Sequence, residues 1–339
     1  MSENREKSLI YSAKDLKKLY PVTGGILRRT IGHVRALDGV NLDIFRGETI
    51  SIIGESGCGK TTLGRILTLL QKPTSGELQF HFGTHEIDVN KLIGNELMAF
   101  RKSVQMIFQD PYTSFNPRQR VGAAMDEVLK VQDVKDGDER RARIDEAMQM
   151  VNMRRDYLNR YPHEFSGGQR QRLSIARCLA ARPNLIIADE IVSALDVSIQ
   201  AQILNLLREI QTETGLSFVF ITHDVAVARF VGHRVAVMYL GQIMELLPAE
   251  LLPNGAEHPY TIALMSAVPN MNVSENRKLK ILSGETPSPI NAPTGCPFST
   301  RCQYVMDRCI TERPQLRPSH AGKSGHQIAC HLEEPPNQG

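Results

Sequence analysis

Features that would place this 339-residue chain in a membrane or on nucleic acid are missing from its sequence. No run of about 18 apolar residues occurs, so the chain is not expected to span a membrane by itself. The stretch from Met1 to Lys7 is polar and charged, and it lacks the apolar core of a secretory signal peptide. The formal net charge is only +3, which gives no signal for nucleic acid. These absences predict a cytoplasmic protein.

Cysteine is scarce, and internal repeats and low-complexity tracts are absent. The six cysteines include no C-x-x-C pair. Disulfides are rare in a reducing compartment, so another use for the cysteines is expected.

One stretch organises the rest of the chain. Residues 49–53 are dominated by β-branched residues and predict a buried strand, and residues 63–70 continue as an apolar-periodic helix. Between them, Gly54 to Thr61 fits G-x-x-x-x-G-K-[ST], a loop whose backbone N–H groups bind phosphates. Lys60 can reach the β- and γ-phosphates, and the Thr61 hydroxyl can ligate Mg²⁺. The residues assigned to this phosphate loop are Gly54, Glu55, Ser56, Gly57, Cys58, Gly59, Lys60, Thr61 and Thr62.

Strand and helix patterns alternate along most of the chain, which predicts an α/β fold with a mainly parallel sheet. Apolar residues alternate from Val34 to Ile44 about Asp38-Gly39, and they predict two antiparallel strands joined by a turn. From about residue 110 to 175 the spacing is helical and predicts an insertion into the core.

The composition changes after Leu252, where proline becomes frequent. One short helix near Tyr260 to Ala267 and then mostly loop are expected there. We therefore predict a nucleotide-binding domain over residues 1–252 and a C-terminal extension over residues 253–339.

Polar residues end three of the predicted buried strands. Asp189 can hold Mg²⁺, and Glu190 can polarise an attacking water. Gln109 can contact the metal or the water, and His223 can hydrogen-bond the γ-phosphate. Because strand ends of such sheets face the ligand crevice, these side chains are expected to point toward a bound ligand.

A second anion-binding element is predicted at Ser166, Gly167, Gly168 and Gln169, where a serine N-cap and two glycines open a helix. Two phosphate-binding elements in one chain do not obviously serve one nucleotide. A dimer in which each chain gives one element to a shared nucleotide resolves this.

These motifs together resemble an ABC-type ATPase. The likeness covers the phosphate loop, Gln109, the Ser166–Gln169 signature, Asp189 with Glu190, the D-loop from Ser193 to Asp196, and His223, in the order of that family. It implies ATP and Mg²⁺ as cofactors, and it places Tyr20 where an aromatic residue stacks on adenine. One departure is Ile191, where the family usually has proline after the glutamate.

Finer stretches resemble the ATPase subunits of bacterial dipeptide and oligopeptide importers, most of all the second ATPase subunit of a dipeptide permease. These are residues 108–118, 161–166, 258–261 and 284–289. The resemblance implies ATP hydrolysis that powers peptide import at the cytoplasmic face of the inner membrane. The implied partners are a second ATPase chain, two transmembrane permease subunits and an extracytoplasmic solute-binding protein, with no nucleic acid.

Two alternatives remain. Close relatives import other small solutes such as nickel chelates or opines, and an ATPase subunit need not touch the solute. A non-transport ABC ATPase acting on DNA or ribosomes belongs to another class. The single ATPase unit, the lack of a long coiled coil and the near-neutral charge argue against it.

Four cysteines lie in the C-terminal extension, with gaps of five, six and twenty residues between Cys296, Cys302, Cys309 and Cys330. Four thiolates suit tetrahedral Zn²⁺ or an iron–sulfur cluster, and four unrelated buried cysteines are a third interpretation. The family resemblance implies a [4Fe–4S] cluster, with zinc as the alternative. Since these cysteines are far in sequence from the phosphate loop, no catalytic part is expected for them.

Overall fold

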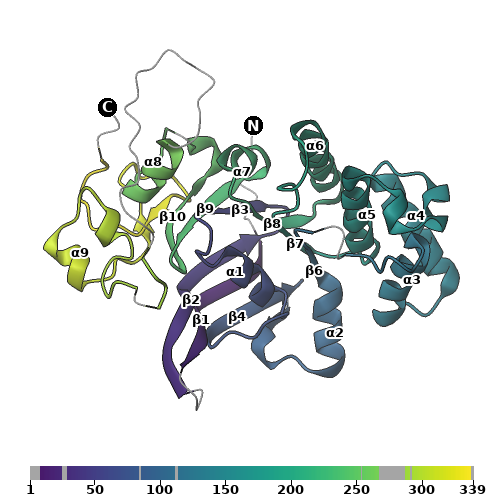
Figure 1. Ribbon diagram of the computed structural model, residues 1–339, viewed down its shortest axis with the longest axis horizontal. Helices are drawn as coiled ribbons and strands as arrows, with labels where there is room; N and C mark the ends of the chain where they lie inside the picture. The colour runs from purple at the N-terminus through teal and green to yellow at the C-terminus, as the bar shows by residue number, and fades with distance from the viewer. Residues whose placement is uncertain are drawn as a thin grey trace.

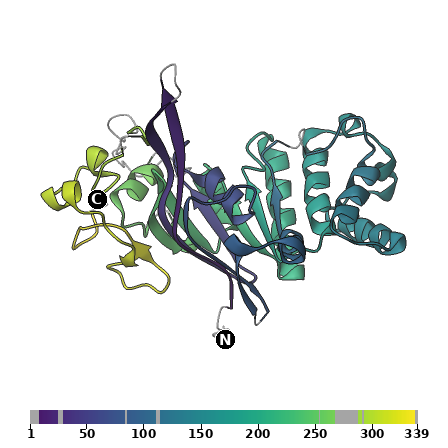
Figure 2. The same ribbon diagram turned by 90° about the horizontal axis from the view of Figure 1, so that it is seen from below.

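The computed structural model describes residues 8–24, 29–83, 85–110, 114–252, 254–266, 287–290 and 292–336. Three parts lie side by side along the longest axis (Figures 1 and 2). A β-rich core is in the middle, a group of helices is at one end, and the C-terminal segment is at the other. No helix in these ranges is long and apolar enough to cross a membrane.

The core is built on one large sheet, which has eight strands within the described residues, in the order β11-β12-β10-β9-β3-β8-β7-β6. Its parallel strands are β3 (Thr49–Ile53), β6 (Val104–Ile107), β7 (Leu185–Asp189), β8 (Ser217–Ile221) and β9 (Arg234–Tyr239). Every residue of β3, β7, β8 and β9 is buried. Continuous apolar runs are typical of parallel strands covered on both faces, and the predicted parallel α/β fold is confirmed.

Alternate residues of these strands belong to two different hydrophobic clusters. Ile186 and Phe218 join the cluster shared with the helical insertion. Leu185 and Val219 join the cluster shared with α1 (Lys60–Leu67) and a second, antiparallel sheet. The side-chain period of two along a strand thus attaches a separate layer to each face of the large sheet.

The second sheet runs β2-β1-β4-β5 and is antiparallel. Its strands are β1 (Leu9–Gly24), β2 (Arg29–Phe45), β4 (Ser75–Phe82) and β5 (His85–Asp88). The predicted hairpin about Asp38-Gly39 is wrong, because both residues lie inside the single strand β2. Gly39 has φ 92° at an irregularity where Asp38 and Val40 pair with adjacent residues of β1. The true partner of this segment is β1, which the sequence pattern did not reveal as a strand.

The helical insertion contains α3 (Val121–Val131), α4 (Gly137–Met150) and the start of α5 (Gly167–Ala180). It follows α2 (Gly94–Ser103) and β6. In the part of the chain that is described, α6 (Val197–Thr214) and α7 (Val225–Val231) complete the helices of the core. The short helix α7 was not predicted from the sequence.

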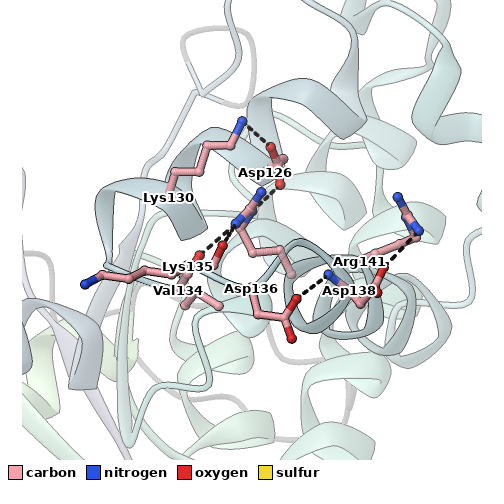
Figure 3. A network of polar contacts seen from close by, with 8 residues as sticks. Asp126, Lys130, Val134, Lys135, Asp136, Asp138 and Arg141 are labelled. Atoms are coloured by element: carbon pink, nitrogen blue, oxygen red, sulfur yellow. Dashed lines mark hydrogen bonds and ion pairs between the residues drawn. The ribbon is translucent and has the colours of Figure 1, made fainter.

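Arg140 ties α3, α4 and the loop between them together through Asp126, Val134 and Lys135, which are labelled in Figure 3. Its Nε lies 2.6 Å from Asp126 Oδ1, and its Nη1 donates to the carbonyl oxygens of Val134 and Lys135. Lys130 pairs with Asp126 at 2.8 Å. Partial burial raises the pKa of Asp126, but hydrogen bonds from Lys130 and Arg140 outweigh it and hold that pKa below its usual value. The carboxylate is therefore the common anchor of both helices.

The C-terminal segment extends the large sheet. β10 (Gln242–Pro248) pairs with β9 and with β12 (Gln327–Ile328), and β12 pairs with β11 (Arg317–Pro318). Between them lie α8 (Pro259–Ser266) and α9 (Asp307–Thr311). The predicted short helix near Tyr260 is confirmed as α8, while Ala267 lies outside the described residues.

Candidate active site

The phosphate loop connects the end of β3 to the start of α1, as the sequence predicts. Gly54 and Glu55 follow the strand, and Lys60 is the first residue of the helix. Gly54 has φ 149°, and a Cβ there would come within 2.1 Å of the Met238 carbonyl oxygen. Gly59 has φ 108°, and a Cβ there would lie 2.3 Å from the carbonyl oxygen of Ala36. Both glycines are thus required by close backbone approach as well as by conformation.

Lys60 is buried and turns back onto its own loop. Its Nζ donates to the carbonyl oxygens of Gly54 at 2.8 Å and of Glu55 at 3.0 Å. The Cys58 side chain is buried in the core cluster, with its sulfur 3.8 Å from the Lys60 nitrogen. Cys58 therefore offers only its backbone to a bound anion.

Thr61 and Asp189 meet across the edge of the sheet. The Thr61 hydroxyl donates to Asp189 Oδ1 at 3.2 Å, and Asp189 is only 4% exposed. Burial raises the pKa of Asp189, and the neighbouring Glu190 carboxylate raises it further against the Thr61 hydrogen bond. A hydroxyl and a partly desolvated carboxylate side by side are oxygen ligands of the kind that Mg²⁺ takes.

Glu190 is the meeting point of the strand-end residues. Gln109 donates from Nε2 to Glu190 Oε2 at 3.2 Å, and His223 Nδ1 lies 3.4 Å from the same oxygen. These residues follow β6, β7 and β8, which are neighbours in the sheet. The structure thus brings together Gln109, Glu190 and His223, three of the four strand-end residues that the sequence placed at the ligand crevice.

The backbone of Glu190 is strained. Its φ of 48° is uncommon for a residue with a side chain. The conformation is held by its N–H, which donates to the Ile221 carbonyl, and by its own carbonyl, which accepts from the Ser193 N–H and hydroxyl. Ile191, which departs from the family pattern, buries its side chain in the core. Strained residues of this kind gather at functional sites, where surrounding contacts keep them in place.

The signature element begins α5 on the insertion side of the molecule. Ser166 is the N-cap and accepts from the Gln169 N–H at 3.3 Å, while the Gln169 side chain accepts from the Ser166 N–H at 3.0 Å. A Cβ on Gly168 would lie 2.5 Å from Ile199 Cγ2 of α6. Asp196 is the N-cap of α6 and accepts from the Ile199 N–H. The described contacts therefore join the signature and the D-loop to each other.

Tyr20 lies on β1 and pairs with Val34 of β2. Two residues after Val34, the carbonyl oxygen of Ala36 lies close to Gly59 of the phosphate loop. Its hydroxyl donates to Gln71 Oε1 at 2.6 Å, and Lys18 Nζ is 5.2 Å from the ring centroid. The tyrosine is thus on the strand pair that supports the phosphate loop.

The four cysteines of the extension lie near one another. The Cys296 N–H donates to the Cys309 carbonyl at 2.7 Å. Burial is the main reason that the pKa of Cys296 rises to about 12 and that of Cys302 to about 11, and the charges of neighbouring cysteines, including Cys330, add to it. Among the described residues, no group of three or more His, Cys, Asp or Glu side chains is arranged to hold a single metal ion.

Two residues of the C-terminal segment also reach the phosphate loop, and the sequence analysis missed both. Tyr260 and Arg301 contact Glu55. Tyr260 belongs to one of the stretches with family resemblance, but its spacing gives no hint of this contact.

Comparisons with known proteins agree with this arrangement. The family model described as ABC transporter matches residues 37–193, and the model described as oligopeptide/dipeptide transporter, C-terminal region, matches residues 244–309. The chain is 44% identical to the dipeptide transport ATP-binding protein DppF of Haemophilus influenzae, over 97% of this chain and 98% of that protein. It is also 44% identical to the oligopeptide transport ATP-binding protein AppF of Bacillus subtilis, over 95% of this chain and 97% of that protein.

A solved structure supports the same assignment. The dimeric, post-hydrolysis ATP-binding cassette MJ0796, bound to ADP and phosphate, matches with a TM-score of 0.60 and 32% identity. The match covers 71% of this chain and 99% of that one. With the motifs, the sheet order and the full-length relatives taken together, this chain belongs to the ATP-binding proteins of ABC transporters, in the branch that carries the oligopeptide/dipeptide transporter C-terminal region.

Proposed function

We propose that this chain is the ATP-hydrolysing subunit that powers import of dipeptides or oligopeptides. The observation that carries the proposal is the convergence of Gln109 and His223 on Glu190, next to the Thr61–Asp189 pair. The named relatives transport dipeptides and oligopeptides, and the C-terminal match points to the same branch.

The roles follow from the geometry. Lys60 leaves its loop carbonyls to bind the β- and γ-phosphates, and Thr61 with Asp189 would hold Mg²⁺, which supplies charge neutralisation on the phosphates. Glu190 orients and activates the attacking water. Gln109 and His223 position Glu190 and sense the γ-phosphate.

The signature element would serve the nucleotide of a second ATPase chain. Ser166 and the N–H groups of Gly167 and Gly168 form a capped helix N-terminus that suits a phosphate. Support comes from the close approach of Gly168 to Ile199, whose N–H donates to Asp196, and from the dimeric cassette that this chain resembles. Tyr20 would stack on the adenine. The proposal requires a partner ATPase chain, with both chains contributing to each site, and the family resemblance favours a heterodimer.

We assign the membrane contacts to the segment after Gln109. Residues 110–118 and the insertion would bind two transmembrane permease subunits, and an extracytoplasmic binding protein would deliver the solute. Pro111, Tyr112 and Thr113 of this segment lie outside the described residues, as do Gly284, Glu285 and Thr286 of the extension. The chain would sit at the cytoplasmic face of the inner membrane, with residues 1–252 as its ATPase domain and 253–339 as the extension.

The four cysteines of the extension would hold a [4Fe–4S] cluster in a structural role. Their shared position and four-thiol donor set suit it. We expect Cys302→Ser to lose iron and sulfide after anaerobic purification and Cys178→Ala, in the insertion core, to retain them. Stoichiometric zinc without iron would show that the four cysteines bind Zn²⁺ and not a cluster.

The proposed function is tested by the assembly of this chain with permease subunits and by the coupling of its ATP hydrolysis to a loaded binding protein. Tagged protein expressed with its genomic neighbours should co-purify with permease subunits. In vesicles, its ATP hydrolysis should rise when the peptide-loaded binding protein is added. A chain that instead co-purifies with ribosomes or DNA, and hydrolyses ATP without regard to any binding protein, would contradict it. If a binding protein loaded with a nickel chelate or an opine stimulated ATP hydrolysis, the proposed solute would be wrong but the proposed role in import would stand.

A further inference from the structure

Glu55 of the phosphate loop is held at three points. Its N–H donates to the Tyr260 hydroxyl at 3.0 Å, and its carbonyl accepts from Lys60 at 3.0 Å. Its two carboxylate oxygens lie 3.0 and 2.9 Å from Arg301 Nη1. The contacts with Tyr260 and Arg301 come from the C-terminal extension, and Arg301 is 246 positions further along the chain. The extension thus reaches the nucleotide site directly.

The ion pair is largely shielded from water, since the side chains of Arg301 and Glu55 are 7% and 21% exposed. Pairs in such surroundings interact more strongly than the exposed pairs of a protein surface. Glu55 is the acidic residue of the phosphate loop. An uncompensated carboxylate there would repel a bound triphosphate, and Arg301 supplies the opposite charge.

Arg301 is in turn positioned by the four-cysteine segment. It lies between Cys296 and Cys302, and its N–H donates to the Phe298 carbonyl at 3.0 Å. The Phe298 ring packs against Tyr239 and Tyr260, with centroids 5.5 and 5.4 Å apart. These rings belong to one buried cluster that also contains Cys296 and Cys309. The folding of this segment therefore decides where the guanidinium points.

We propose that Arg301 is a positioning residue of the ATP site. It neutralises Glu55 and, together with Tyr260, fixes the first residues of the phosphate loop, so that the fold of the four-cysteine segment sets the affinity for nucleotide. The inference rests on the proposed ATP site. It leaves the expectation that the cysteines have no catalytic part unchanged, and it gives the segment that carries them a positioning role.

The experiment is a double-mutant cycle on the full chain in its assembled complex, read out by titration with a fluorescent ATP analogue. Arg301→Gln should weaken nucleotide binding about tenfold, because the Glu55 carboxylate loses the opposite charge of Arg301 next to the bound phosphates. Glu55→Gln alone should bind within about twofold of the wild type or more tightly. The double variant should recover to within about threefold, because the carboxylate that causes the repulsion is gone.

Arg308→Gln is the matched control, since Arg308 also precedes a cysteine but pairs on the surface with Glu312. It should bind nucleotide as the wild type does. Iron and sulfide content should be unchanged in Arg301→Gln, which separates loss of the ion pair from loss of the segment. Lys60→Ala tests the ATP site itself: wild-type binding in that variant contradicts the proposed function, whatever Arg301 does.

If Arg301 had only a structural role, Glu55→Gln would not restore nucleotide affinity to Arg301→Gln. Arg301→Lys should retain part of the affinity, and Tyr260→Phe should weaken binding without rescue by Glu55→Gln. Wild-type affinity in Arg301→Gln, or equally weak binding in Arg301→Gln with and without Glu55→Gln, overturns the proposal while Lys60→Ala still loses the nucleotide.

Discussion

The helical insertion and the C-terminal extension lie at opposite ends of the molecule and are joined to the core differently (Figures 1 and 2). Apolar residues of α3 and α4 belong to the same cluster as one face of the large sheet. The extension also packs apolar side chains against β9 and β10, but in addition it adds strands to β10 and buries polar groups against it. Glu245 of β10 is 0% exposed and accepts hydrogen bonds from the N–H groups of Glu257 and His258. It also lies 2.8 Å from His326 Nε2.

The two ends are therefore held against the core by different kinds of contact. Apolar contacts are non-directional, so the attachment of the insertion to the sheet depends on no single polar pair. Buried polar groups tolerate no loss of a partner, so the extension is fixed with respect to the sheet and to the phosphate loop. The stability of each end should therefore depend on different side chains, and the following variants test this.

The largest effect is expected at the extension. Glu245→Ala removes the acceptor of two N–H groups and the partner of buried His326, and should lower the free energy of unfolding by about 3–5 kcal/mol. Urea unfolding of the full chain gives this value. Glu312→Gln, which breaks an exposed pair in the same extension, is the control and should cost less than about 1 kcal/mol. Equal losses for the two would remove Glu245 as the anchor.

A smaller effect is expected in the insertion, where Arg140→Gln loses the bond to Asp126 and its contacts to two carbonyl groups (Figure 3). The free energy of unfolding should fall by about 1–2 kcal/mol. Arg141→Gln removes only an exposed pair with Asp138 and should change it by a few tenths of a kcal/mol, about the size of a surface pair. Thermal unfolding of both variants, side by side, decides whether Arg140 has the role assigned to it.

The smallest effect is expected between the two ends, at Asp189. Because its pKa is raised in the folded state, ionisation there opposes folding, and stability falls as pH rises through the interval above its ordinary pKa. Asp189→Asn should therefore stabilise the metal-free chain at neutral pH by about 1 kcal/mol while it weakens Mg²⁺ binding. The gain should vanish below the ordinary pKa of aspartate. Calorimetry that shows the same gain at every pH would contradict this explanation.

Much of this arrangement could be predicted from the sequence. The strands next to Gly54, Asp189 and His223 are short, mainly apolar runs bounded by polar residues, so their type and their shared edge follow from local pattern. The strand β1 and the contact of Arg301 with Glu55 could not be predicted. The first depends on pairing with β2, and the second joins positions that local periodicity does not relate.

The central claim is that Glu190 activates water at a site where Lys60 binds the phosphates. ATP binding and hydrolysis by Glu190→Gln and Lys60→Ala, measured in the assembled complex, test it most directly. We predict that Glu190→Gln retains ATP but loses turnover by about a hundredfold or more, and that Lys60→Ala loses ATP binding itself. Wild-type turnover in Glu190→Gln would contradict the account.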